Sequence, residues 1–313
     1  MKRWHANLVL LLAGATWGMG FVAQSTAMDS IGPMLFIALR FSVAALVVLP
    51  FALHESRRMS GSGSHALCAT DWLKFILIGW CMFGGMATQQ VGLLSTSVTN
   101  SGFLTGLYVV FTPILAVLLF REIPHRITWL AAMLSLAGIY LLAGGRLDAL
   151  VIGDLLTILS AIFWALQLVL IARFVGQTGR PLALALTQFS VIAVVALVLA
   201  WLLEPIDGTS IIAAAPQILF AGVFAGGFAF TLQVIAQRYT SASQAAIFLS
   251  SEAPFAALFA FLLLDERTGW IGIAGCGLIL TAMLAVELVP QWSMQRLERI
   301  RSGIKHGSIK ELP

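Results

Sequence analysis

The stretch STSVTNSGFL, from Ser95 to Leu104, decides the fold, because the segment YTSASQAAIFL, from Tyr239 to Leu249, is a near copy of it. A proline and, sixteen residues further on, a tryptophan follow each copy: Pro113 and Trp129 after the first, Pro254 and Trp270 after the second. Each copy belongs to a block of five apolar segments. Since five is odd, two such blocks in tandem would cross a membrane in opposite orientations. The sequence therefore predicts an inverted repeat.

The composition is that of a chain whose main solvent is lipid. Of the 313 residues, 10% are charged and 59% are hydrophobic, and the mean hydropathy is +0.95. A soluble domain carries about 25% charged residues. In lipid every backbone amide needs an internal partner, which leaves helices or closed barrels. The apolar runs are about 20 residues long, as a spanning helix requires, and lack the strict alternation of barrel strands. We expect an all-α integral membrane protein.

Ten transmembrane helices are expected, arranged as two inverted five-helix repeats. The expected spans are Asn7–Gln24, Pro33–Leu53, Trp72–Val91, Thr99–Phe120, Ile127–Ala143, Gly153–Phe174, Leu182–Leu203, Pro216–Ala236, Gln244–Leu264 and Thr268–Leu288. The first repeat would occupy residues 1–145 and the second residues 146–289, followed by a basic cytoplasmic tail at residues 290–313.

The distribution of Lys and Arg predicts the orientation. With the N-terminus in the cytoplasm, all 18 of these residues lie on the inner side except Arg146 and Arg267 outside and Arg40 within a span. This asymmetry is typical of membrane proteins with both termini inside. The net charge of +4 comes largely from the tail, which indicates contact with the anionic membrane surface and not with nucleic acid. Six tryptophans near span ends are expected as interface anchors: Trp4, Trp72, Trp129, Trp201, Trp270 and Trp292.

The two five-helix halves, from Asn7 to Leu288, resemble the drug/metabolite transporter superfamily, in particular its EamA family, and the second half matches best. The resemblance rests on GDLLTILSAIFWALQLV, residues 153–169, which is similar to the opening helix of the family repeat. It rests also on residues 232–280, which carry Glu252 and Pro254, then the acidic Glu266, then a glycine-rich helix. The resemblance implies a ten-helix permease of the bacterial inner membrane, often an exporter of amino acids or related metabolites. It also implies a central cavity lined by helices one, three, four, six, eight and nine.

Two charged residues within the expected spans are candidates for the transport pathway. Glu252 is near the middle of the ninth span, where a charged acid costs about 3 kcal/mol and normally faces a cavity or a partner. It can bind a substrate amine, couple transport to protons, or simply form a hydrogen bond between helices. Arg40 is some seven residues inside the second span. It can bind a substrate carboxylate, pair with Glu252, or extend to the lipid headgroups. Glu287, at the inner end of the last span, is expected to be solvated.

Amides and aromatic rings supply the remaining candidates. Gln90, beside Gln89 in the third span, corresponds to Gln233 in the eighth, and Asn100 corresponds to Gln244. Equivalent positions of inverted repeats meet near the pseudo-two-fold axis, where amides bind zwitterions or join helices.

Trp17 and Trp164 are equivalent residues of the first and sixth spans. They can line a cavity for aromatic or cationic groups or pack between helices. Trp80 and Tyr108 are weaker candidates of the same kind.

The function predicted from these features is secondary transport of a small polar metabolite such as an amino acid or derivative, exported or exchanged by alternating access, with protons as a possible coupling ion. An integral membrane enzyme acting on a lipid-soluble substrate and a drug efflux carrier of the same family are the alternatives. No catalytic residue is assigned, because the five histidines are scattered through loops and the tail. The three cysteines have no metal-like spacing, and a Walker A loop is absent, so no metal or cofactor is expected. Ten helices can surround a cavity as a monomer or in a homodimer.

Overall fold

The computed structural model describes residues 1–61, 67–96, 98–145, 151–264 and 269–307, and every regular element among them is helical. The elements are α1 (Arg3–Ala27), α2 (Pro33–Gly61), α3 (Ala69–Gly92), α4 (Val98–Thr105), α5 (Tyr108–Phe120), α6 (Arg126–Leu142), α7 (Ile152–Thr178), α8 (Pro181–Leu203), α9 (Gly208–Ala213), α10 (Ala215–Phe220), the π-helix η1 (Ala221–Phe230), α11 (Thr231–Ala236), α12 (Ala242–Leu249), α13 (Glu252–Leu264) and α14 (Trp270–Gly307).

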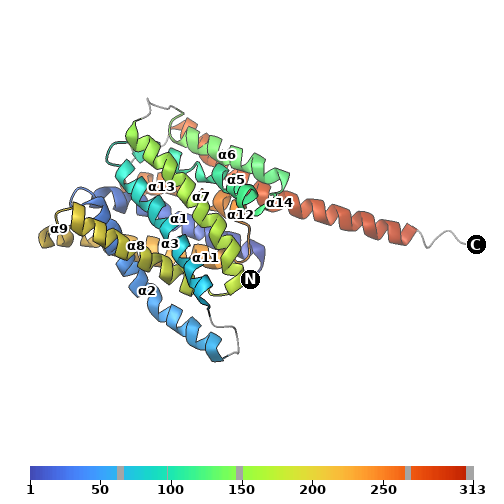
Figure 1. Cartoon of the computed structure of the whole chain (residues 1–313). Coiled ribbons are helices and arrows are strands. Elements are labelled where there is room, and N and C mark those ends of the chain that lie inside the picture. Colours follow the sequence, from blue (N-terminus) through green and yellow to red (C-terminus); the bar gives the residue numbers. More distant parts are fainter. Residues whose placement is uncertain (62–66, 97, 146–150, 265–268, 308–313) are drawn as a thin grey trace, which may run out of the picture.

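The helices form one bundle from which the C-terminal part of α14 extends (Figure 1). Six helical stretches of the described chain are long and apolar enough to cross a membrane, namely residues 33–59, 101–120, 152–178, 181–203, 215–236 and 270–289. The bundle exposes large apolar side chains over its outer surface, for example Leu46, Leu118 and Leu203. This arrangement is that of a multi-pass membrane protein.

Several expected spans are interrupted. The stretch 99–120 divides into α4 and α5 around Gly106, where an added Cβ would approach Ile139 Cδ1 within 2.7 Å. The stretch 244–264 divides into α12 and α13 at Ser250 and Ser251. Pro254 lacks the N–H that would bond the Ser250 carbonyl, and the Ala253 N–H donates to that carbonyl instead, at 3.2 Å.

The structure adds two further details, one within an expected span and one at the C-terminal end. The stretch 216–236 contains the ten-residue π-helix η1, which the sequence pattern did not predict. The expected tail at residues 290–313 is continuous with the last helix, because α14 runs to Gly307; residues 308–313 lie outside the described part.

The helices pack in a small set of pairs. Extensive contacts join α2 to α8, α6 to α14, α3 to α7 and α1 to α13. Further contacts join α3 to α8, η1 to α2, η1 to α1, α5 to α7 and α12 to α5. The α6–α14 contact brings backbones together, since an added Cβ at Gly138 would be 2.6 Å from the Gly275 carbonyl oxygen. Small residues of this kind let membrane helices approach closely.

The pair α2 and α8 is held by two reciprocal helix caps. The Glu204 carboxylate, just after α8, accepts from the N–H groups of Met34 and Leu35 at the start of α2, both at 2.8 Å. The Glu55 carboxylate, near the end of α2, accepts from the first N–H groups of α8, those of Leu182 at 3.2 Å and Ala183 at 3.1 Å. Each carboxylate satisfies donors that a helix leaves unpaired and interacts favourably with the helix dipole.

Candidate functional site

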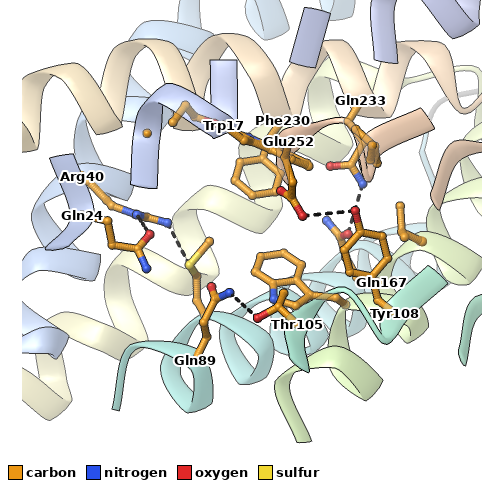
Figure 2. Close-up of a pocket in the computed structure, with 16 residues that line it drawn as sticks. Trp17, Gln24, Arg40, Gln89, Thr105, Tyr108, Gln167, Phe230, Gln233 and Glu252 are labelled. Carbon is orange, nitrogen blue, oxygen red and sulfur yellow. Dashed lines mark hydrogen bonds between the residues drawn. The ribbon is translucent and has the colours of Figure 1, made fainter. Parts of the chain in front are cut away.

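A cavity lies in the interior of the bundle. Its lining comes from α1, α2, α3, α4, α5, α7, η1, α11, α12 and α13, so both halves of the chain contribute. Figure 2 shows the polar side chains converging on it, with Arg40 and Gln24 at one side and Gln233 and Gln167 at the other. The combination of apolar walls with a few convergent polar groups is typical of a small-molecule binding site.

Aromatic rings make one wall. The Trp17 indole packs on the Phe230 ring with centroids 4.4 Å apart. Trp164 stacks on the same Phe230 ring, with centroids 5.8 Å apart and an angle of 12° between the ring planes. The Trp17 Nε1–H donates to the carbonyl oxygen of Ala225 in η1, at 2.9 Å. These contacts give the wall a fixed surface, with the indole N–H satisfied by backbone.

Among the described residues that line the cavity, the acidic side chain is that of Glu252, the first residue of α13. Its Oε1 accepts from the Tyr108 hydroxyl at 3.2 Å (Figure 2). The backbone of α13 at Glu252 packs closely against α1. A Cβ added at Gly18 would be 2.8 Å from the Glu252 carbonyl oxygen and 2.7 Å from the Ala256 nitrogen. Glu252 therefore presents a carboxyl group to the cavity from a backbone that has little freedom to move.

Arg40 lies at another side of the cavity. Its guanidinium donates to Gln24 Oε1 at 3.1 Å and to Met86 Sδ at 2.8 Å. The Phe41 and Phe36 rings lie 4.8 and 5.3 Å from its carbon Cζ. Arg40 and Glu252 do not form an ion pair, and Arg40 does not extend to the outer surface, since it is 4% exposed.

The amides form two groups. Gln89 donates to the Thr105 hydroxyl at 2.8 Å. On the other side, Gln233 donates to Gln167 at 3.2 Å and to Gln237 at 3.1 Å, and Gln167 donates to Gln188 at 2.9 Å. The second group continues from the cavity into the helix interfaces, so part of it joins helices and part faces the empty space.

The structure brings together five of the seven residues named from the sequence: Trp17, Arg40, Trp164, Gln233 and Glu252 all line the cavity. Gln90 is not part of the lining; it is fully buried and donates to Met28 Sδ at 2.7 Å, whereas the adjacent Gln89 faces the cavity. The side chain of Asn100 lies outside the described part of the chain.

Sequence reasoning gave Tyr108 little weight and did not name Gln24, Gln167 or Thr105 as candidates. Gln24 lies about two helical turns after the candidate Trp17, on the same face of the helix. This spacing could have identified Gln24 as a residue of the same site. Trp80, named as a weaker candidate, is half exposed on the outer surface of α3. The tryptophans expected near the interfaces, Trp4, Trp72, Trp129, Trp201 and Trp270, are exposed, and the side chain of Trp292 is not among those described.

A cluster at the end of the bundle near the N-terminus corrects the expectation for Glu287. This residue was expected to be solvated, but its side chain is 15% exposed. Its Oε2 accepts from Asn7 Nδ2 at 2.6 Å and from Gln244 Nε2 at 2.9 Å, and Arg3 approaches it at 3.5 Å. The Glu287 cluster, defined as Arg3, Asn7, Gln244 and Glu287, thereby ties α1, α12 and α14 together.

No group of three or more His, Cys, Asp or Glu side chains within the described ranges is placed to hold a metal ion. The described lining of the cavity offers groups that can bind a solute: the Arg40 guanidinium, the Glu252 carboxyl group, several amides and an aromatic wall.

Comparisons with known proteins agree with a transport role. The model of the EamA-like transporter family matches residues 4–144 and again residues 151–288. A protein of Archaeoglobus fulgidus named "Uncharacterized transporter" is 32% identical over 92% of this chain and 87% of its own length. A protein of the same name from Methanothermobacter thermautotrophicus is 29% identical over 85% of this chain and 81% of its own.

A protein of known crystal structure has the same fold. It superposes with a TM-score of 0.77, covering 92% of this chain and 99% of the other, at 18% identity. The two matches of the family model cover most of the sequence, and the relatives are named as transporters and not as enzymes. This chain is a membrane transporter of the EamA-like transporter family, which is part of the drug/metabolite transporter superfamily.

Proposed function

We propose that the chain is a secondary carrier that exports or exchanges a small polar metabolite, such as an amino acid or a derivative, by alternating access. The observation that carries the proposal is the central cavity, in which Glu252 and Arg40 face a space enclosed by both halves of the chain. Charged groups at this depth of a membrane protein are costly and normally serve a solute or an ion. Protons are the coupling ion that a carboxyl group in the cavity would support.

The pattern of helix packing supports two inverted repeats and ten spans. If α4–α5, α10–η1–α11 and α12–α13 each count as one span, the contacts come in corresponding pairs. The contact between α3 and α7 in one arrangement corresponds to the contact of η1 and α11 with α1 in the other. In the same way, the α1–α13 contact corresponds to the α7–α5 contact. The α2–α8 and α6–α14 pairs join equivalent spans directly. The reciprocal caps of the α2–α8 pair, by Glu55 and Glu204, follow the same symmetry.

The repeats also suggest the mode of action and the orientation. Carriers with inverted repeats expose a fixed central site alternately to the two sides of the membrane as one bundle rocks against the other. The positive charges place both termini in the cytoplasm, and we assign the chain to a bacterial inner membrane as a monomer or homodimer. The Glu287 cluster, near the N-terminus, would then close the cytoplasmic end of the cavity.

Counterflow in proteoliposomes tests the proposal. Vesicles holding the purified protein are preloaded with pools of amino acids, amino-acid derivatives, nucleosides or cationic drugs, and exchange of labelled solute is measured with and without a pH gradient. We expect saturable exchange of one polar pool and an effect of the gradient that Glu252→Gln removes. Glu122→Gln, which changes a carboxylate in an exposed ion pair, is the matched control.

Each other result has a definite meaning. Exchange of the drug pool alone would assign drug efflux instead. No exchange of any pool by protein that is folded in the bilayer would contradict the carrier proposal. A gradient effect that persists in Glu252→Gln would exclude this acid from proton coupling.

A further inference from the structure

Arg40 carries a charge that no carboxylate of the described residues neutralises. It is 4% exposed, and both of its hydrogen-bond acceptors, Gln24 Oε1 and Met86 Sδ, are neutral. No described carboxylate forms an ion pair with it, and the acid of the same cavity, Glu252, bonds Tyr108 instead. A buried cation is normally paired, because removing a charge from water is unfavourable unless an opposite charge or hydrogen bonds compensate. The two phenylalanine rings against Arg40 offset only part of that cost.

Two hydrogen-bond donors remain unused at the same place. The Arg40 Nε–H and the Gln24 Nε2 amide are both buried and have no partner in the structure. The orientation of the Gln24 amide is fixed, because its oxygen accepts from Arg40. Both side chains line the cavity and lie at the same side of it in Figure 2. This corner of the cavity thus has a positive charge and spare donors and lacks a negatively charged acceptor.

We propose that Arg40 and Gln24 form a subsite for an anionic group of the transported solute, either a carboxylate or a phosphoryl group. The inference rests on the proposed function, which it makes more specific: the solute is an organic anion or a zwitterion. The planar guanidinium fork matches both oxyanions geometrically, and a charge-assisted hydrogen bond is about twice as strong as a neutral one. Gln24 supplies a further donor to the same oxyanion.

The test measures binding to the full-length protein in detergent, so it does not depend on transport. The probes are three pairs of similar shape that differ in charge: L-leucine and L-leucinamide, 4-methylpentanoate and 4-methylpentanamide, and isopentyl phosphate and isopentanol. Titration is followed by tryptophan fluorescence, since Trp17 and Trp164 line the cavity. We expect the member of at least one pair that carries the carboxylate or phosphate group to bind about tenfold or more tightly than its partner without that group. The pair that shows this preference identifies the anion as a carboxylate or a phosphate.

Variants then assign the preference to the subsite. We expect Arg40→Gln to abolish the preference for the anionic group. Arg40→Lys should retain part of the preference, because the charge remains without the planar fork. Gln24→Leu should weaken the preference several-fold. Arg173→Gln, which removes an exposed arginine outside the cavity, should keep the full preference. Circular dichroism and thermal unfolding of each variant show whether it is folded.

The inference is overturned if the wild-type protein shows no anion preference in any of the three pairs, a result that needs no variant. It is also overturned if folded Arg40→Gln keeps the preference. Anion binding without counterflow of any solute would contradict the carrier proposal and leave the subsite standing, so failures of the two proposals can be told apart.

Discussion

At the scale of single residues, the site depends on side chains whose positions are fixed by the opposite half of the chain. Trp17 comes from the first helix, yet its indole N–H donates to Ala225, some two hundred residues away in the sequence. Glu252 accepts from Tyr108 across the same boundary. The cavity wall is therefore a product of the contact between halves, and removing one such bond should affect the stability of the whole protein.

Trp17→Phe tests this dependence. The variant keeps an aromatic ring against Phe230 but loses the hydrogen bond, so we expect the free energy of unfolding to fall by about 1 kcal/mol. Unfolding by sodium dodecyl sulfate, followed by circular dichroism, measures the change. Trp80→Phe is the control, because Trp80 is half exposed on the outer surface, and it should change stability by less than about 0.5 kcal/mol. Equal effects of the two substitutions would contradict the role given to the Trp17 bond.

Residue type and depth in a span were sufficient to predict much of the site. Glu252 and Arg40 were named because charged groups are unusual at membrane depth, and Gln233, Trp17 and Trp164 because they occupy equivalent positions of the two repeats. The sequence could not choose between Gln89 and Gln90, since adjacent residues differ by about 100° around a helix and both lie on faces that contain apolar residues. The expectation that Glu287 is solvated was wrong for a related reason: its hydrogen-bond partners Asn7 and Gln244 are distant in sequence.

At the scale of helices, positions and approximate ends were predictable because each apolar run has the length of a bilayer crossing. The breaks within them were not. The division at Ser250 follows from the missing N–H of Pro254. At the α4–α5 break only the packed structure reveals that Gly106 lies close to Ile139. The reciprocal caps could not be predicted for the same reason, because in the sequence Glu55 and Glu204 are acidic residues just after the end of an expected span.

The caps give a prediction about helix pairing. Glu55→Ala and Glu204→Ala each remove a carboxylate that bonds two backbone N–H groups, so each should lower the free energy of unfolding by about 1–2 kcal/mol. Glu122→Ala, which removes only an exposed ion pair, should cost at most about 0.5 kcal/mol. The same dodecyl sulfate titration checks all three variants. Loss of stability in one cap variant without the other would contradict the equivalence of the two ends.

At the scale of the whole molecule, the Glu287 cluster and the cavity lie in series along the bundle. Gln244 and the cavity-lining Leu249 belong to one helix, α12, and all of the residues between them are buried. Access to the cavity from the end of the bundle near the N-terminus therefore requires α12 to separate from α1 and α14. The hydrogen bonds of Glu287 oppose that separation.

Labelling of an introduced cysteine tests this closure. Ala246 is fully buried between Gln244 and Leu249, so Ala246→Cys, in a chain whose native cysteines are replaced, should react slowly with a membrane-impermeant maleimide. We expect Glu287→Ala to raise the rate at least about fivefold, because losing two hydrogen bonds to a carboxylate shifts the equilibrium towards separation. Glu122→Ala should leave the rate unchanged. An unaltered rate in Glu287→Ala would show that apolar packing alone closes this end.

The π-helix η1 makes one part of the chain sensitive to its winding and not only to its composition. Its i→i+5 hydrogen bonds accommodate more residues in each turn than an α-helix does, and α11 with Gln233 follows directly. Rewinding η1 into ordinary α-helical turns with the same number of residues would rotate everything that follows, because a residue turns an α-helix by about 100° and a wider π turn by less. Gln233 would then face away from the cavity, although every residue lining it was still present. The winding of the backbone between Ala221 and Phe230 is thus as much a determinant of the site as the residues themselves.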